Sequence, residues 1–297
     1  MTTVAFIGLG AMGRPMAANL ARAQFSVRAF DVVAAARDSL LALAPQATSC
    51  VSAEDAARGA DALVLMVVNA DQAEAALFGA GALDALAPGA SVILMATCAP
   101  KRVEDIAARV AAAGRRFIDA PVSGGVAGAQ QAGLTIMVGA DDAAFAAAEP
   151  LLKAMGDKVF RVGDRPGQGA AVKTVNQLLC GVHIAVAAEG LALAEKAGID
   201  GELFLKVLGG SAAGSWMLNN RGPRMAAADP PVASAVDIFV KDLGIVLDAG
   251  RAQKAATPLA AAALQMFLAA SANGFGAMDD SQVVRVYRAL NGQSKDA

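Results

Sequence analysis

Short runs of apolar residues alternate with amphipathic stretches along the first half of the chain. Each run is bounded by turn residues, which is typical of a buried strand. Strands that alternate with helical stretches indicate βαβ units, and therefore a parallel sheet covered by helices. The expected strands are Val4–Gly8, Val27–Asp31, Ala62–Val68, Ser91–Met95, Arg116–Ile118, Leu134–Val138 and Val159–Val162.

The pattern changes at a cluster of breaker residues, Gly163, Pro166, Gly167 and Gly169. No convincing strand follows this cluster, and the remaining apolar positions favour helices. We therefore predict an α/β fold with two domains. A Rossmann-type, doubly wound parallel sheet occupies residues 1–163, and an all-helical domain occupies residues 164–297. The expected helices of the second domain are Ala170–Ala197, Glu202–Leu208, Ala235–Arg251, Leu259–Ala272 and Val283–Leu290.

A glycine-rich turn follows the first expected strand and leads into a helix. One glycine permits the tight turn, the second lets a pyrophosphate approach the backbone, and the third allows close packing of helix and strand. The alternative is a plain glycine-rich turn, because 30 glycines give many chances for such a match. The flanking strand and helix favour a dinucleotide site, made by Gly8-Leu9-Gly10-Ala11-Met12-Gly13.

Polar residues at the ends of later strands are candidates for further cofactor contacts, because ligands bind beyond the carboxyl ends of parallel strands. Asp31 ends the second strand, where a carboxylate accepts ribose hydroxyls and repels a 2′-phosphate, so NAD is expected rather than NADP. Arg28 and Arg37 lie near enough in sequence to leave NADP open. The further candidates are Val68, Asn69 and Thr97, with ordinary helix caps as the alternative for the last two.

A second group of candidates lies near the predicted domain boundary. Ser123, Gly124 and Gly125 offer a hydroxyl and two backbone amides to a substrate carboxylate, although an ordinary loop has the same composition. On the helix that follows the boundary, the spacing of Lys173, Asn176, Gln177 and Cys180 places them along one face. A lysine among apolar residues and neutral amides has a lowered pKa and can act as a base. The alternative is an extended surface lysine.

Composition excludes several classes of function. A net charge of −2 gives no electrostatic footprint for nucleic acid, and Ala62–Val68 is too short to span a membrane. A single histidine, His183, argues against a histidine metal centre or a Ser-His-Asp hydrolase, and no metal site is expected. Three widely spaced cysteines, together with a first strand that begins at Val4 and leaves no room for a leader, predict a cytoplasmic protein.

Four motifs in this order resemble the β-hydroxyacid dehydrogenase family, which includes 3-hydroxyisobutyrate dehydrogenase and tartronate semialdehyde reductase. They are GLGAMG at Gly8–Gly13, DAPVSGG at Asp119–Gly125, GQGAAVKTVNQ at Gly167–Gln177 and FVKDL at Phe239–Leu243. The resemblance implies an NAD-dependent oxidation of a small hydroxy acid with Lys173 as the catalytic residue. It also implies that Ser123 and Gly124 anchor the substrate carboxylate and that Lys241 closes over the nicotinamide end. A helix-surface ion pair with Asp237 is the alternative for Lys241.

One position departs from the family pattern, and it bears on substrate binding. Many members carry an asparagine four residues after the lysine, where this chain has Gln177 and places Asn176 one residue earlier. Either amide can orient the substrate. Several segments are most similar to the L-threonate branch of the family, namely Leu65–Asn69, Asn176–Ile184, Ser215–Met217 and Ser234–Asp242.

Other readings remain open. The first is 3-hydroxyisobutyrate oxidation or an NADPH-dependent semialdehyde reductase. The second is an imine reductase, although that class generally lacks a lysine at the position of Lys173. The third is a cofactor-binding module without catalysis. The apolar segment Ala255–Ala270 suggests a subunit interface, and we expect a homodimer or homotetramer.

Overall fold

The computed structural model describes residues 1–293, and within them the chain divides into two compact units. Unit 1 comprises residues 1–173, and unit 2 begins at Thr174. Helix α9, Gln168–Lys196, belongs to both units because its first turn packs with unit 1. The boundary expected after residue 163 precedes this helix.

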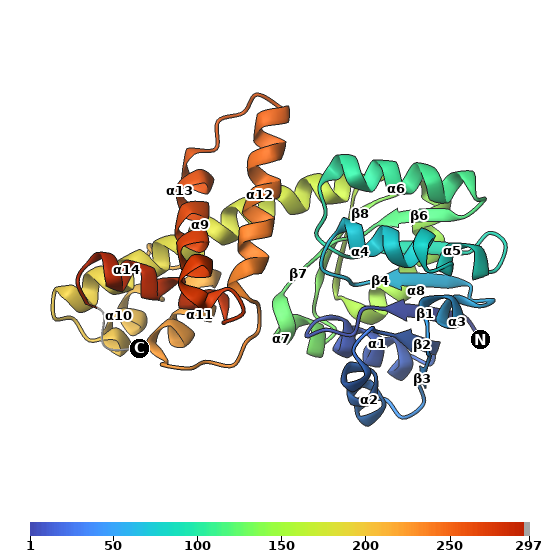
Figure 1. Ribbon diagram of the computed structural model, residues 1–297, viewed down its shortest axis with the longest axis horizontal. Coiled ribbons are helices and arrows are strands. Elements are labelled where there is room, and N and C mark those ends of the chain that lie inside the picture. Colours follow the sequence, from blue (N-terminus) through green and yellow to red (C-terminus); the bar gives the residue numbers. More distant parts are fainter. Residues whose placement is uncertain (294–297) are drawn as a thin grey trace. The chain divides into compact units, whose positions relative to one another are not determined.

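Unit 1 is built on one sheet, in which the strands run in the order β3-β2-β1-β4-β5-β6-β8-β7, with β9 paired to β8 (Figure 1). The order reverses direction at β1, as in a doubly wound fold, so the carboxyl ends of β1 and β4 lie side by side there. The strands are β1 Thr3–Ile7, β2 Ser26–Phe30, β3 Thr48–Ser49, β4 Ala62–Leu65, β5 Ser91–Leu94, β6 Arg116–Asp119, β7 Val122–Ser123, β8 Thr135–Gly139 and β9 Lys158–Gly163.

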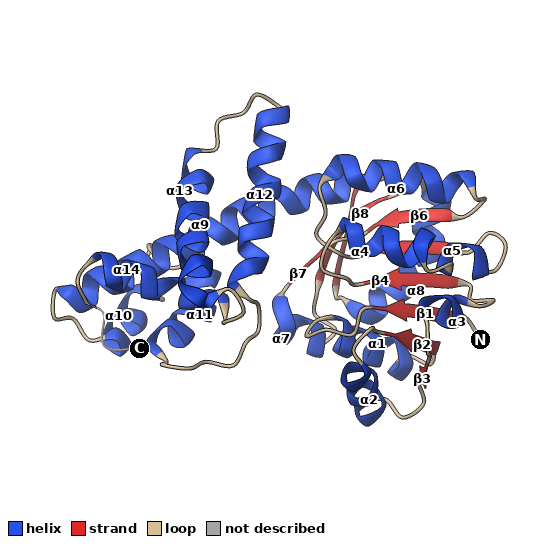
Figure 2. Cartoon of the chain, in the orientation of Figure 1, coloured by secondary structure: helices blue, strands red, loops and turns tan. Residues whose placement is uncertain are grey.

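Helices cover both faces of this sheet (Figure 2). The central strands are buried on both faces, so their residues alternate between two separate cores. Val4, Phe6 and Val64 belong to one core, whereas Ala5, Leu63 and Leu65 belong to the other. The helical segments are α1 Gly13–Arg22, α2 Ala34–Leu43, α3 Ala53–Ala57, α4 Ala70–Glu74, η1 Ala75–Gly79, α5 Ala82–Ala85, α6 Pro100–Ala112, α7 Gly125–Gln130 and α8 Asp142–Met155.

The expected strands are confirmed, but the sheet is not parallel throughout. β8 runs antiparallel to β6 and β7, and β9 is parallel to β8. The connection between β6 and β8 contains the two-residue strand β7, which itself pairs antiparallel with β8, and the short helix α7. The two-residue strands β3 and β7 were not predicted, because two residues carry no periodic signal.

Unit 2 is helical, and its described residues contain only an isolated bridge between Ala235 and Asp279 in addition to helices. Its core gathers around α9, whose buried residues include Ile184, Ala188 and Leu191. The other helical segments are α10 Gly201–Leu208, α11 Trp216–Ala226, α12 Val236–Ala252, α13 Pro258–Ala270, η2 Ser271–Phe275, η3 Asp280–Val283 and α14 Val284–Leu290.

Among the described residues, two helical segments are long and apolar enough to cross a membrane, judged by length and composition alone. They are α9 and the segment Pro258–Phe275. More than half of the most apolar window of α9 is buried, which is typical of the core helix of a globular unit. The corresponding window of Pro258–Phe275 is 22% buried, so much of its apolar surface stays exposed.

Candidate functional site

The three glycines of the β1–α1 turn differ in what surrounds them. A Cβ atom at Gly8, whose φ is +97°, would lie 2.5 Å from the carbonyl oxygen of Met66, and one at Gly13 would lie 1.9 Å from the carbonyl oxygen of Gly8. Gly8 thus permits the turn and Gly13 the close packing of α1. A Cβ atom at Gly10 would meet no described atom within 4 Å, apart from its own chain neighbours.

The open space at Gly10 adjoins the N-terminus of α1. Met12 precedes this helix without a side-chain cap, and its first turn contains no acidic residue. The positive end of the helix dipole is therefore available to an anion. A dinucleotide pyrophosphate fits this turn, because the backbone at Gly10 can be approached and no carboxylate in the first helical turn opposes it.

Asp31 connects the end of β2 to the glycine turn. Its Oδ2 accepts a hydrogen bond from the Leu9 amide at 2.6 Å, and its Oδ1 accepts one from the Val33 amide at 2.8 Å. Arg28 donates to the carbonyl oxygens of Arg58 and Asp55 and forms an ion pair with Asp55. Since this guanidinium is engaged in those contacts, it does not neutralise Asp31.

Arg37 contacts the backbone of Asp31 itself. Its Nη1 donates to the carbonyl oxygen of Asp31 at 2.6 Å, and its guanidinium lies over the ring of Phe30. A positive charge therefore remains beside the Asp31 carboxylate. This arginine is the feature of the site that would favour a 2′-phosphate.

The later strand ends place the remaining cofactor candidates beyond β4 and β5. Asn69 is the N-cap of α4, and its Oδ1 accepts a hydrogen bond from the Gln72 amide at 2.9 Å. This oxygen therefore caps a helix, as in the alternative given for Asn69. Val68 is exposed, and its amide donates to Oε1 of Gln72. Thr97 follows β5 and is half-buried.

The segment predicted to hold a carboxylate has a defined backbone. Ser123 ends β7 and pairs with Thr135 of β8, so it is part of the sheet edge rather than of an irregular loop. Gly124 and Gly125 follow with φ values of +130° and +63°, a conformation that favours glycine. They turn the chain from β7 into α7.

Lys173 lies one turn into α9 and is 6% exposed, so it is not an extended surface lysine. The helix begins against the carboxyl end of β6, where the Oδ2 atom of Asp119 accepts hydrogen bonds from the amides of Gly167 and Ala170, each at 2.9 Å. Asp119 is 1% exposed. Burial raises the pKa of its carboxyl to about 7, and the hydrogen bonds from the backbone amides oppose that rise.

Two glycines allow the first turn of α9 to approach the sheet this closely. A Cβ atom at Gly169 would lie 2.5 Å from the carbonyl oxygen of Met137, and one at Gly139 would lie 2.6 Å from the carbonyl oxygen of Arg165. Side chains at these positions would displace the helix from β8. The start of α9 is thus held by a carboxylate on one strand and by close backbone packing on the next.

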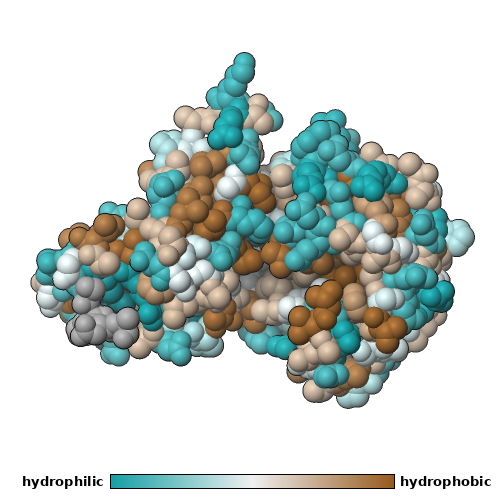
Figure 3. Space-filling view, in the orientation of Figure 1, coloured by the Kyte–Doolittle hydropathy of each residue, from teal (hydrophilic) through white to brown (hydrophobic). Residues whose placement is uncertain are grey.

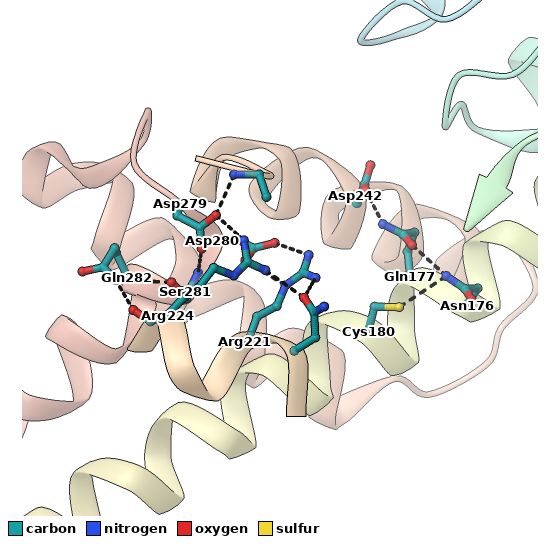
Figure 4. Close-up of polar contacts among 12 residues, drawn as sticks. Asn176, Gln177, Cys180, Arg221, Arg224, Asp242, Asp279, Asp280, Ser281 and Gln282 are labelled. Atoms are coloured by element: carbon teal, nitrogen blue, oxygen red, sulfur yellow. Dashed lines mark hydrogen bonds and ion pairs between the residues drawn. The ribbon is translucent and has the colours of Figure 1, made fainter. Parts of the chain in front are cut away.

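Unit 2 contains a chain of polar contacts between α9 and α12 (Figure 4). The Nε2 atom of Gln177 donates to Oδ2 of the buried Asp242, while its Oε1 accepts from Nδ2 of Asn176 at 2.9 Å. The same Nδ2 atom lies 3.3 Å from the sulfur of Cys180. Lys241 forms an ion pair with Oδ1 of Asp242 at 2.6 Å. The alternative given for Lys241 from the sequence was an ion pair with Asp237 instead.

A second polar cluster in Figure 4 is structural. Arg221 and Arg224 of α11 form ion pairs with Asp280 and Asp279, at 2.8 and 2.6 Å, and both carboxylates are almost fully buried. Removing one partner from such a pair leaves an uncompensated buried charge, so the cluster ties α11 to η3. Within residues 1–293, no group of three or more potential ligands among His, Cys, Asp and Glu is arranged to hold a metal ion.

Two residues of the site were not singled out from the sequence. Asp119 and Asp242 lie within the quoted motifs, yet each accepts a hydrogen bond from a residue 48 or more positions away in the chain. Their positions in the sequence could have indicated a role, since Asp119 ends a buried strand and Asp242 follows Lys241 on a helix. A carboxylate in such an apolar setting requires a hydrogen-bonding partner.

Comparison with known proteins places both parts of the chain among nicotinamide-dependent dehydrogenases. Residues 3–163 match the family described as the NAD binding domain of 6-phosphogluconate dehydrogenase. Residues 167–287 match the family described as the NAD-binding domain of NADP-dependent 3-hydroxyisobutyrate dehydrogenase.

Individual proteins resemble the chain over nearly its whole length. An L-threonate dehydrogenase of Cupriavidus necator is 45% identical over 96% of this chain and 95% of its own. A 3-hydroxyisobutyrate dehydrogenase of Pseudomonas aeruginosa is 36% identical over 97% of this chain and 99% of its own. The crystal structure of a 3-hydroxyisobutyrate dehydrogenase from Salmonella typhimurium superimposes with a TM-score of 0.91, at 40% identity, over 96% of this chain and 100% of that one.

Proposed function

Because the chain belongs to the β-hydroxyacid dehydrogenase family, that of 3-hydroxyisobutyrate dehydrogenase, we propose that it oxidises L-threonate to 2-oxo-tetronate with NAD. The observation that carries the chemistry is the buried Lys173 in the first turns of α9. The choice of L-threonate is supported by the 45% identity to the L-threonate dehydrogenase of Cupriavidus necator.

The cofactor would be held by the glycine turn and the N-terminus of α1, with Asp31 accepting hydrogen bonds from the ribose hydroxyls. In this proposal Val68, Asn69 and Thr97 would contact the ribose or nicotinamide, and Lys241 would act at the nicotinamide end. When bound, NAD accepts a hydride from the substrate carbon.

The remaining roles fall to side chains of this protein. In its neutral form, the Nζ atom of Lys173 takes the proton from the substrate hydroxyl and becomes an ammonium. Ser123 and the amides of Gly124 and Gly125 donate to the substrate carboxylate and orient it. Burial of Lys173 excludes water from the amine and limits exchange of its proton with solvent.

The contacts in unit 2 support different roles for the side-chain amides of Asn176 and Gln177. Both polar atoms of the Gln177 side chain have partners, since Nε2 donates to Asp242 and Oε1 accepts from Asn176. Nδ2 of Asn176 is likewise directed to Gln177 and Cys180, which leaves its Oδ1 to accept from a donor such as a substrate hydroxyl. We assign the orienting contact to Asn176 and a supporting role to Gln177.

The surface of α9 supports self-association. Val172, Val175, Leu179, Val186 and Leu193 recur at intervals of three, four or seven residues and are exposed in a single chain. Leu259 and Leu268 of α13 are exposed as well. A second copy of the chain would cover such surface, and we propose a homodimer or homotetramer. We also propose that the protein acts in the cytoplasm.

The first experiment measures NADH or NADPH production from L-threonate, D-threonate, D-glycerate and 3-hydroxyisobutyrate, each with NAD and with NADP. We expect turnover of L-threonate with NAD. Lys173→Ala should lower kcat by about 10²- to 10⁴-fold, the range of general-base catalysis. Lys153→Ala, which removes an exposed lysine of α8, serves as the matched control.

Each other outcome identifies a rival. Turnover of another acid would retain the role of Lys173 and reject L-threonate, and a preference for NADPH would favour the semialdehyde reductase. NAD binding without turnover of any acid would leave an imine reductase or an inactive module. A Lys173→Ala variant with nearly full activity would reject the assignment of the base.

A further inference from the structure

The structure assigns Asp119 as the positioning residue of Lys173, because its carboxylate fixes the first turn of α9 against the carboxyl end of β6. This inference rests on the proposed function of Lys173. In the proposed mechanism Asp119 touches neither substrate nor cofactor. It acts through backbone amides of the helix.

The geometry makes the connection direct. One oxygen of Asp119 accepts hydrogen bonds from Gly167 and Ala170, and Ala170 precedes Lys173 by three residues, or about 4.5 Å along a helix axis. Residues three apart lie on neighbouring parts of a helix surface, so a shift of the first turn moves the base of the lysine side chain. Asp119 also ends the strand that precedes the Ser123 segment. The lysine and the expected carboxylate-binding residues are therefore anchored at one point of the sheet.

The burial of Asp119 is difficult to explain without such a role. A carboxylate that is 1% exposed carries a large cost of desolvation, and an uncharged side chain would avoid it. Helices in the same unit are capped by exposed aspartates, as α8 is by Asp141, whose Oδ1 accepts from the Ala144 amide at 2.8 Å. Asp119 differs from Asp141 in being buried and in holding a helix that carries the proposed base.

The test uses chemical labelling of lysines in the full-length protein, which requires no substrate. Trace acetylation by acetic anhydride, read by mass spectrometry for each lysine, reports the accessibility and basicity of Lys173. The exposed residues Lys153 and Lys158 serve as internal standards. In Asp119→Ala we expect Lys173 to be acetylated several-fold faster relative to these standards, because release of the first helix turn would make the amine more accessible.

Kinetics provide the second measurement. A misplaced base should lower kcat of Asp119→Ala by up to about 100-fold, while the KM for NAD changes by less than about twofold. Asp119→Asn keeps an oxygen that accepts from the same amides, and it should restore most of the activity. Asp141→Ala removes a cap from α8 and should lower stability by about 1 kcal/mol without changing kcat or the labelling of Lys173.

Three outcomes would overturn the inference: wild-type labelling and kcat in Asp119→Ala, equal losses in Asp119→Asn and Asp119→Ala, or the same changes in Asp141→Ala. If Asp119→Ala does not fold, Asp119→Ser replaces it, since a serine hydroxyl is too short to reach both amides. Failure of the proposed substrate leaves the labelling result intact, so the two proposals can fail separately.

Discussion

At the scale of single residues, Asp31 has a structural role and a proposed role in cofactor discrimination. Its carboxylate holds the Leu9 amide in the glycine turn and that of Val33 after β2, which fixes its position relative to both segments. The same negative charge opposes a 2′-phosphate on the ribose. Arg37, bound to the carbonyl oxygen of Asp31, is the nearby cation that a 2′-phosphate would need.

We therefore expect Asp31→Asn to change the choice of cofactor. Asparagine keeps one oxygen that can accept from Leu9 but loses the charge, so the ratio of kcat/KM for NAD to that for NADP should fall by about tenfold or more. Steady-state kinetics with both cofactors measure the ratio. Asp38→Asn removes an exposed charge from α2 and should leave it unchanged. An unaltered ratio in Asp31→Asn would show that the carboxylate does not set the preference.

At the scale of elements, the β1–α1 turn separates folding from ligand binding within a few residues. Gly13 is required by packing, because a methyl group there would overlap the carbonyl oxygen of Gly8. Gly10 is not required by any described neighbour. The two positions offer a matched pair of substitutions in one motif.

Gly13→Ala should lower the free energy of unfolding by about 1–3 kcal/mol, the usual cost of overpacking. Gly10→Ala should change it by less than about 1 kcal/mol, yet weaken NADH binding at least about tenfold, because the methyl group occupies the space proposed for the pyrophosphate. Urea unfolding and NADH fluorescence titration measure the two quantities. Equal effects of both substitutions on both quantities would contradict the proposed roles.

The observed helices and strands also show which elements the sequence pattern could predict. Strands such as Val4–Gly8 were predicted within one or two residues, because burial on both faces leaves continuous apolar runs. Helix α11 was missed, since Gly222 and Pro223 lie inside it and are typical of a break. Gly222 lets α11 lie close to α10, because a Cβ atom there would lie 2.2 Å from Cδ2 of Leu205 and would displace that side chain.

For the site, the roles predicted for residues that carry a chemical group within a motif, such as Lys173 and Ser123, stay predictions. The sequence did not reveal the hydrogen bonds of Asp119 and Asp242, because contacts between residues far apart in the chain produce no periodic pattern. The spacing of Lys173, Asn176 and Gln177 correctly predicted a shared face. It could not reveal that this polar face is the buried one.

At the scale of the whole molecule, α9 has its polar and apolar faces reversed relative to a surface helix. Lys173, Thr174 and Gln177 are buried, whereas Val175 and Leu179 are 60% and 50% exposed. Hydrophobic residues also form part of the surface over α12 and α13 (Figure 3). A monomer with this surface would be prone to association.

If the proposed oligomer forms through α9, replacing Val175 and Leu179 together by glutamate should convert it into a folded monomer, because two buried charges per subunit would oppose the interface. Light scattering coupled to size-exclusion chromatography gives the mass, and circular dichroism checks the fold. Lys153→Glu, on the exposed surface of α8, should retain the mass of the wild-type protein. A glutamate double variant of unchanged mass would place the interface elsewhere.

The central position of α9 in unit 2 has a consequence for the order in which the chain is made. Its buried residues pack mainly against helices that follow it in the sequence, and α12 does not begin until Val236. During synthesis on the ribosome, unit 1 can complete its sheet while α9 still lacks those partners. For that interval a long apolar helix is exposed in the nascent chain. Chaperone supply and translation rate should then govern the yield of folded protein, and chains that terminate before α12 should be degraded or aggregate.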